Sequence, residues 1–255
     1  MPRDPLEGDA DDGSSPLLRM SLSRDRDELL RAVRDSRFTG DLALALLQRH
    51  DLPPEVLEAL ARNRETLKDR KVLAAIVTHP RTPRYVWLPM LRHLFTFELM
   101  KISLMPMAAA DLKMSAEQAI LARGENISSG ERISLAKQGS GQLASALLCD
   151  SDARVVEAAL NNPRLTEAGV TRSLNGEREE HTVTAIATHP KWSLRVEVKL
   201  ALLKQQNLPL ARAIAICDRL TAPDCRLALE NSRLPENVKN YLQQKMERRA
   251  MRETS

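Results

Sequence analysis

Two histidines are the most obvious candidates for chemistry in this sequence. The segment AIVTHP contains His79, and the closely similar segment AIATHP contains His189. Imidazole groups can bind a metal or transfer a proton near neutral pH. In comparable segments, however, Asn162 and Asn231 stand in this position, and asparagine does not titrate. Because His and Asn can both hydrogen-bond a carbonyl left free at a helix end, we expect the two histidines to be structural caps.

The other reactive residue types form no recognisable catalytic or metal-binding motif. The three cysteines, Cys149, Cys217 and Cys225, are odd in number and show no close pairing in sequence. This argues against a disulfide framework or a metal cluster and predicts small buried thiols. The segment GSGQ at 139–142 lacks the strand and the Lys-Ser/Thr of a phosphate-binding loop, so it indicates a helix break. We therefore predict no catalytic residue, no metal and no cofactor.

Basic residues offer a sharper hypothesis. Several of them fall on helices expected to line one face of the protein, where they could hold a nucleic-acid backbone. HEAT-like alkylpurine DNA glycosylases use such a concave basic face. The acids Glu167 and Glu197 lie on the same helices, so a solvated surface of mixed charge is the alternative. The candidate binding residues are Arg84, Arg92, Arg172, Arg195 and Lys199.

Composition indicates a helical protein. The chain has 255 residues, of which 43% are hydrophobic and only 3% aromatic, and Ala, Leu and Arg are abundant, which favours helix over sheet. No apolar run is long enough to span a bilayer and the start has no signal-peptide core, so we expect a cytoplasmic protein. The net charge is +4, with acids interleaved among the bases; residues 1–36 alone carry −3.

A repeated pattern organises the chain. Its clearest unit, at 150–174, reads DSDARVVEAALNNPRLTEAGVTRSL. Val156, Ala159 and Leu160 share one helix face. An Asn-Pro pair then ends the helix, and Thr166 is a candidate N-cap for a second helix.

Other segments follow the same frame. In a weaker copy Gly124 replaces the Asn-Pro pair, and Ser128 with Glu131 forms a capping box. Trp87 and Trp192 fall in positions expected to face the core. The residue after each helix break is expected to be a buried anchor; these anchors are Leu52, Thr82, Ile127, Leu165, Trp192 and Leu234.

The best unit resembles the leucine-rich repeat variant family of bacterial helical repeats. That resemblance covers about half the chain and implies a HEAT-type right-handed superhelix with a scaffold or binding role. The founding members carry an N-terminal Cys cluster for iron–sulfur binding; this chain has no Cys before Cys149, so that cofactor is not implied. The residues that carry the resemblance are Asp152, Val156, Ala159, Leu160, Asn162, Pro163, Leu165 and Leu174.

Together these patterns predict an all-α fold, a right-handed α-solenoid of short helical pairs over residues 37–247. A disordered acidic tail at 1–24 and a short amphipathic helix at 25–36 would precede it, and a basic tail at 248–255 would follow. The expected function is that of a non-catalytic scaffold or adaptor that binds a protein partner in its groove. The alternatives are a nucleic-acid-binding HEAT-like protein, such as a DNA-repair glycosylase, and a self-associating structural unit.

Overall fold

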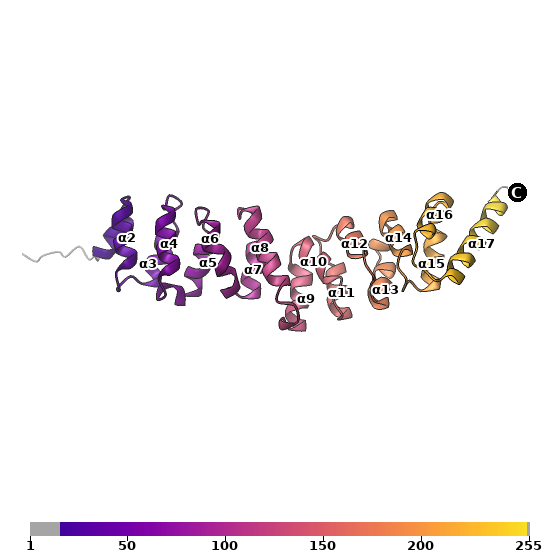
Figure 1. Ribbon diagram of the computed structural model, residues 1–255, viewed down its shortest axis with the longest axis horizontal. Helices are drawn as coiled ribbons and strands as arrows, with labels where there is room; N and C mark the ends of the chain where they lie inside the picture. Colours follow the sequence, from indigo (N-terminus) through magenta and orange to yellow (C-terminus); the bar gives the residue numbers. More distant parts are fainter. Residues whose placement is uncertain (1–15, 254–255) are drawn as a thin grey trace, which may run out of the picture. The chain divides into compact units, whose positions relative to one another are not determined.

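The computed structural model describes residues 16–253, and this part of the chain is entirely helical (Figure 1). It contains 17 α-helices and four short 3₁₀ helices and, within these residues, no strand. The all-α prediction is therefore confirmed. The chain divides into two compact units, the first ending at Ala119 and the second beginning at Ile120.

The helices of the first unit are short. They are α1 (Pro16–Leu22), α2 (Arg26–Arg34), α3 (Gly40–Leu47), α4 (Pro54–Arg62), η1 (Thr66–Lys68), α5 (Arg70–Thr78), α6 (Arg84–Met90), η2 (Leu91–His93), α7 (Thr96–Leu104) and α8 (Ala110–Leu121), the last of which reaches the boundary between units. Alternate helices pack on each other, α1 on α3 and α3 on α5 in one row, and α2 on α4 in another.

The second unit repeats this arrangement. Its helices are η3 (Gly124–Asn126), α9 (Ser129–Gln138), α10 (Gly141–Leu147), α11 (Ala153–Leu160), α12 (Glu167–Ser173), α13 (Glu180–Thr188), η4 (Trp192–Leu194), α14 (Val196–Leu203), α15 (Leu210–Cys217), α16 (Ala222–Glu230) and α17 (Glu236–Glu253). Helices α9, α11 and α13 form one row, and α10, α12, α14 and α16 form the other (Figure 1). Neighbours in a row are two helices apart in sequence, so the unit is a two-row helical array.

Polar residues start many of these helices as the sequence predicts. Thr166 accepts a hydrogen bond from the Gly169 amide at the start of α12. Ser128 and Glu131 form the expected capping box on α9. The predicted break at 139–142 is also present, because α9 ends at Gln138 with Gly139 as its C-cap, and Ser140 caps α10. Gly141 is required there, since an added Cβ would collide with the Arg164 backbone carbonyl.

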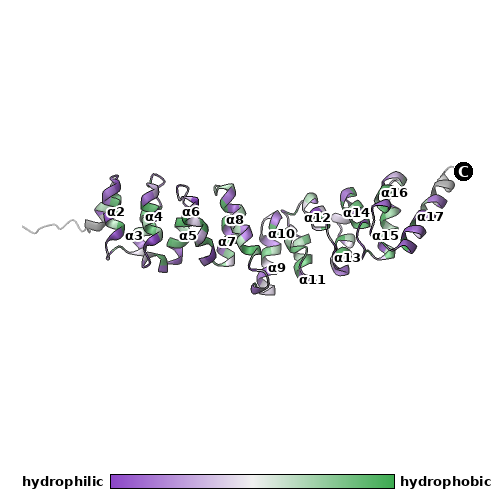
Figure 2. Cartoon of the chain, in the orientation of Figure 1, coloured by the Kyte–Doolittle hydropathy of each residue, from purple (hydrophilic) through white to green (hydrophobic). Residues whose placement is uncertain are grey.

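The core lies between the two rows. Most helices carry a hydrophobic and a hydrophilic side (Figure 2). In the second unit one continuous cluster of buried side chains runs from Ala136 to Leu242. All six predicted anchors are buried, and so are Trp87 and Trp192, which confirms them as core residues rather than exposed contact residues.

Polar side chains join neighbouring helices of a row in the first unit. Asn63, after α4, donates from Nδ2 to the carbonyl of Val33 at the end of α2, over 3.0 Å. His79 caps α5, and its Nε2 lies 2.8 Å from the carbonyl of Arg49, just after α3. His79 Nδ1 accepts the Arg81 amide at 3.2 Å, which makes Nε2 the donor to that carbonyl. The predicted capping role of His79 is confirmed, with a carbonyl of the preceding helix in the row as its partner.

The same joints recur in the second unit. Asn162 donates to the carbonyls of Ala136 and Gly139 at 2.7 and 3.1 Å and accepts the Arg164 amide at 2.7 Å. Three further side chains donate to the end of the preceding helix in their row: Trp192 to Leu160, Gln205 to Leu174 and Ser232 to Leu203. Each bond joins residues 23 to 32 positions apart. We call these contacts, together with those of Asn63 and His79 in the first unit, the row joints.

At two positions a neighbouring residue, and not the expected His or Asn, forms the bond to the preceding helix. His189 caps α13, but its Nδ1 accepts the Lys191 amide, and Trp192 supplies the bond to the preceding helix. Asn231 is exposed and bonds back to Leu227 in its own helix, while Ser232 forms the joint. The sequence pattern equated Asn231 with His79 and Asn162, but at the end of α16 the joint is formed by the next residue, Ser232.

The predicted tails are wrong in part. Residues 16–22 form helix α1, which packs on α2 and α3 instead of remaining disordered. Arg49 secures its end by donating to the carbonyls of Ser21 and Ser23 at 3.2 and 2.7 Å. Residues 1–15 of the predicted acidic tail lie outside the described part. At the other end α17 continues to Glu253, through most of the segment predicted as a tail.

The cysteines also differ from the expectation. Cys149 is exposed, whereas Cys217 and Cys225 are buried. The end of α15 and the start of α16 bring the sulfur atoms of Cys217 and Cys225 to 2.8 Å. The thiol–thiol contact, together with burial, raises the pKa of Cys217.

We predict that a row joint contributes far more stability than an adjacent exposed asparagine. Asn162→Leu leaves two carbonyls and one amide without their partner in a site that is 1% exposed. The free energy of unfolding, measured by urea denaturation, should fall by about 2–4 kcal/mol. The matched change Asn161→Leu removes an exposed bond within one helix and should cost under about 0.5 kcal/mol. Equal losses in the two variants would contradict a special role for the joint.

We also predict an acid-sensitive contribution from His189. Burial, assisted by Lys191, lowers the pKa of His189 below its ordinary value of 6.5. The unfolded chain therefore binds the proton more readily than the folded chain. The contribution of the neutral His189 ring to the free energy of unfolding is fully present above about pH 6.5 and is lost as the pH falls through the folded-state pKa. His189→Asn should reduce the drop in melting temperature between about pH 7.5 and 5.5. An unchanged drop would show that His189 does not contribute to it.

Candidate interaction surface

The five predicted binding residues are divided between the two units. Arg84 and Arg92 belong to the first unit and the other three to the second. Arg84 is exposed at the start of α6, with its guanidinium 6.0 Å from the centre of the Trp87 ring. Arg92 lies in η2, where its Nε is 3.1 Å from Nε2 of His93.

In the second unit the three residues have different surroundings. Arg172 is exposed on α12. Arg195 precedes α14, and its Nε lies 3.9 Å from a carboxylate oxygen of Glu167. Lys199, on α14, is only 7% exposed and lines a pocket together with residues of α15.

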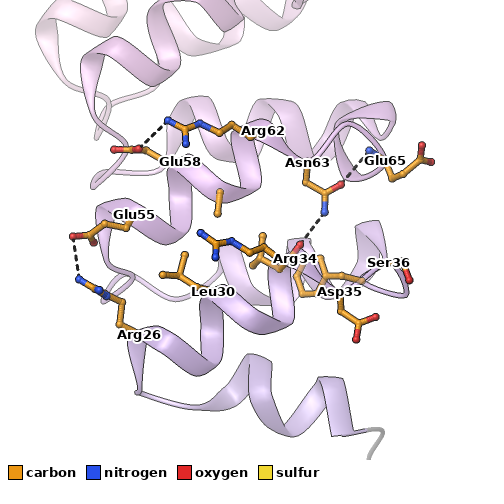
Figure 3. Close-up of a pocket in the computed structure, with 13 residues that line it drawn as sticks. Arg26, Leu30, Arg34, Asp35, Ser36, Glu55, Glu58, Arg62, Asn63 and Glu65 are labelled. Carbon is orange, nitrogen blue, oxygen red and sulfur yellow. Dashed lines mark hydrogen bonds and ion pairs between the residues drawn. The ribbon is translucent and has the colours of Figure 1, made fainter.

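A groove of mixed charge lies between α2 and α4 in the first unit (Figure 3). Its volume is about 560 Å³. The two helices are neighbours in one row, and the half-buried side chains of Leu30 and Ala59 form part of an apolar floor. The joint residue Asn63 closes one end of the groove. The packing of the array therefore creates the groove and fixes the spacing of its walls.

The walls of the groove carry both signs of charge. Arg26 of α2 faces Glu55 of α4 at 3.8 Å, and Arg62 faces Glu58 at 3.5 Å (Figure 3). Arg34 points between the two helices, and no ion pair of Arg34 is found among the described residues. One arginine of the groove is thus available to an anion, while the other two are balanced by acids.

An acid at the groove rim stays ionised under all ordinary conditions. Arg37 donates to Asp35 through its side chain at 2.9 and 3.1 Å and through its backbone amide at 2.9 Å. These bonds lower the pKa of Asp35 to about 2. Asp35 therefore contributes a permanent negative charge to the rim of the groove.

Apolar and aromatic side chains adjoin the groove. The hydroxyl of Tyr85, on α6, donates to Glu58, and this bond raises the pKa of the phenol. Tyr85 is 65% exposed, and Leu88, one helical turn further, is 43% exposed. Tyrosine and arginine next to apolar surface are the residue types enriched at protein interfaces.

The sequence pattern did not identify the groove residues. The spacing of Glu58 and Arg62, four positions apart on one helix, was visible as a surface ion pair. Their relation to Arg26 and Arg34 depends on the stacking of α2 against α4, which no local pattern reveals.

Comparison with protein-family models, with curated proteins and with solved structures gave no match for this chain. Within residues 16–253 no three His, Cys, Asp or Glu side chains are grouped so that they could hold a metal ion. None of the helices described is both long and apolar enough to cross a bilayer.

We predict weak, non-specific binding to duplex DNA. Arg195 is close to an acid and Lys199 is buried, so few phosphates could be neutralised together. The dissociation constant at physiological salt should be no tighter than about micromolar, with a shallow salt dependence. Arg172→Ala combined with Arg195→Ala should change it by less than about threefold. Fluorescence anisotropy over a salt series measures this; nanomolar binding with a steep slope, or excision of a base from alkylated DNA, would contradict it.

Proposed function

We propose that this protein is a non-catalytic scaffold that binds a protein partner through the groove between α2 and α4. The observation that carries the proposal is the combination of an apolar floor, alternating charges and an adjoining exposed tyrosine in one unit. Protein interfaces combine these features, whereas a surface for nucleic-acid backbone is predominantly positive.

The groove suggests the chemistry of the partner segment. Arg34 would pair with a carboxylate of the partner, because the other two arginines already face Glu55 and Glu58. An apolar side chain of the partner would cover Leu30 and Ala59 on the floor. Rim charges of this kind set orientation and selectivity, and the apolar contact supplies affinity.

We further propose that the helical array is a right-handed α-solenoid of the kind implied by the resemblance to leucine-rich repeat variants. The two-row packing and the row joints, which recur over about 30 residues, support this architecture. A solenoid would hold the groove in a preformed shape, which reduces the entropy lost on binding. The cytoplasm of a bacterium is the proposed setting.

The proposal is tested by reversing one charge in the groove. Arg34→Glu places a negative charge where the partner's carboxylate is expected, so affinity for the captured partner should fall at least about tenfold. Arg31→Glu is the matched control, since Arg31 is an exposed arginine in the last turn of the same helix and does not line the groove.

The measurement is a pull-down from nuclease-treated native lysate, followed by titration of the purified partner against both variants. Loss of binding in Arg34→Glu with retention in Arg31→Glu is the expected result. Equal binding by the two variants, or capture that disappears with nuclease treatment, would contradict the proposed function.

A further inference from the structure

A second, smaller pocket in the second unit has a different chemical character. It has a volume of about 390 Å³ and is bordered by the end of α13 and by η4, α14 and α15. Three cationic side chains line it, from Lys199, Arg212 and Arg219, together with the hydroxyl group of Ser193. No carboxylate lines it. This pocket shares no residue with the groove and does not depend on the function proposed above.

Lys199 is the central feature of the pocket. Its side chain is more than nine-tenths buried, yet no ion pair or hydrogen bond of its ammonium is found among the described residues. The ammonium nitrogen itself is not among the side-chain atoms that are fully withdrawn from solvent, so the stem of Lys199 is buried while its charge faces the open pocket. The buried stem thus holds the charge in a position where an anion in the pocket can contact it.

The two arginines are placed to contact the same anion. Arg212 lies near the start of α15, and Arg219 lies in the turn that follows the end of this helix. Both line the pocket, as does Ala215 of the same helix. Both arginines are exposed, and no ion pair of either is found within the described part of the chain.

The nearest acids do not cancel this charge. Asp218, next to Arg219, forms an ion pair with Lys245 at 2.8 Å. Glu197, on the same helix as Lys199, lines a different pocket with Lys204 and Arg233. The C-terminal end of α13 contributes a partial negative charge of only about half an electron. Three full positive charges therefore dominate the pocket.

We propose that this pocket binds a phosphoryl group. A phosphate monoester carries about −1.5 to −2 charges at neutral pH and three strong acceptor oxygens, which matches three cations and a hydroxyl better than a single carboxylate does. The arginines would supply paired N–H donors, Lys199 would supply a point charge, and Ser193 would donate its hydroxyl hydrogen. The phosphoryl group could belong to a free phosphorylated compound or to a phosphorylated side chain of a protein.

Calorimetric titration of the full chain tests the proposal with inorganic phosphate, pyrophosphate, a phosphoserine peptide and its unphosphorylated form, all at matched ionic strength. Lys199→Met keeps the length of the stem and removes the charge. It should weaken binding of each bound phosphoryl probe about tenfold to a hundredfold. Without a ligand its melting temperature should be close to that of the parent, because the buried stem is kept and no hydrogen bond or ion pair is lost.

The double variant Arg212→Gln with Arg219→Gln changes only exposed residues, and it tests the proposal even if Lys199→Met fails to fold. It should weaken binding to a similar degree, whereas the control Arg226→Gln, an exposed arginine on α16, should not. Binding of phosphate and pyrophosphate alone would assign a free ligand, and preference for the phosphoserine peptide would assign a protein ligand. Failure of every phosphoryl probe to bind at millimolar concentration, or equal binding by the parent and both pocket variants, would overturn the proposal.

Discussion

The fold depends on how each short helix satisfies the carbonyl groups at its end. An α-helix leaves its last four carbonyls without partners inside the helix. Here the side chain that follows one helix donates to the end of the preceding helix in the same row, as Asn63 does to Val33 and Asn162 does to Ala136. One contact therefore satisfies a helix end and fixes the spacing of two helices.

This arrangement explains why the joints use several residue types. The position requires a side-chain donor. His79 and Asn162 also accept the backbone amide two residues further on, and Ser232 does both with one hydroxyl group, whereas Trp192 and Gln205 supply only a donor. Since the joints and the apolar core lie inside the array, other side chains are free for the binding roles that we propose for the α2–α4 groove and for the pocket lined by Lys199.

Much of the local structure could be predicted from the sequence, because helix periodicity and capping are local effects. The N-cap Thr166, the capping box at Ser128 and the buried anchors were all identified in this way. The burial of Lys199 was not, because it depends on α15 packing against α14. The tail prediction was wrong over α1 because it extended the polar composition of residues 1–15 over the segment PLLRMSL, which contains three leucines and a methionine. Packing on α2 and α3 and two bonds from Arg49 hold this helix in place.

Native-state hydrogen exchange tests the central role of the joints most directly. The backbone amides of Arg81 and Arg164 lie in turns, where amides ordinarily exchange fast, yet each donates to a joint side chain. If the row joints hold the helix ends together, both amides should be protected from exchange nearly as well as the amides of the neighbouring helices. Exchange of both at the rates of an unstructured peptide, while the helices stay protected, would contradict it.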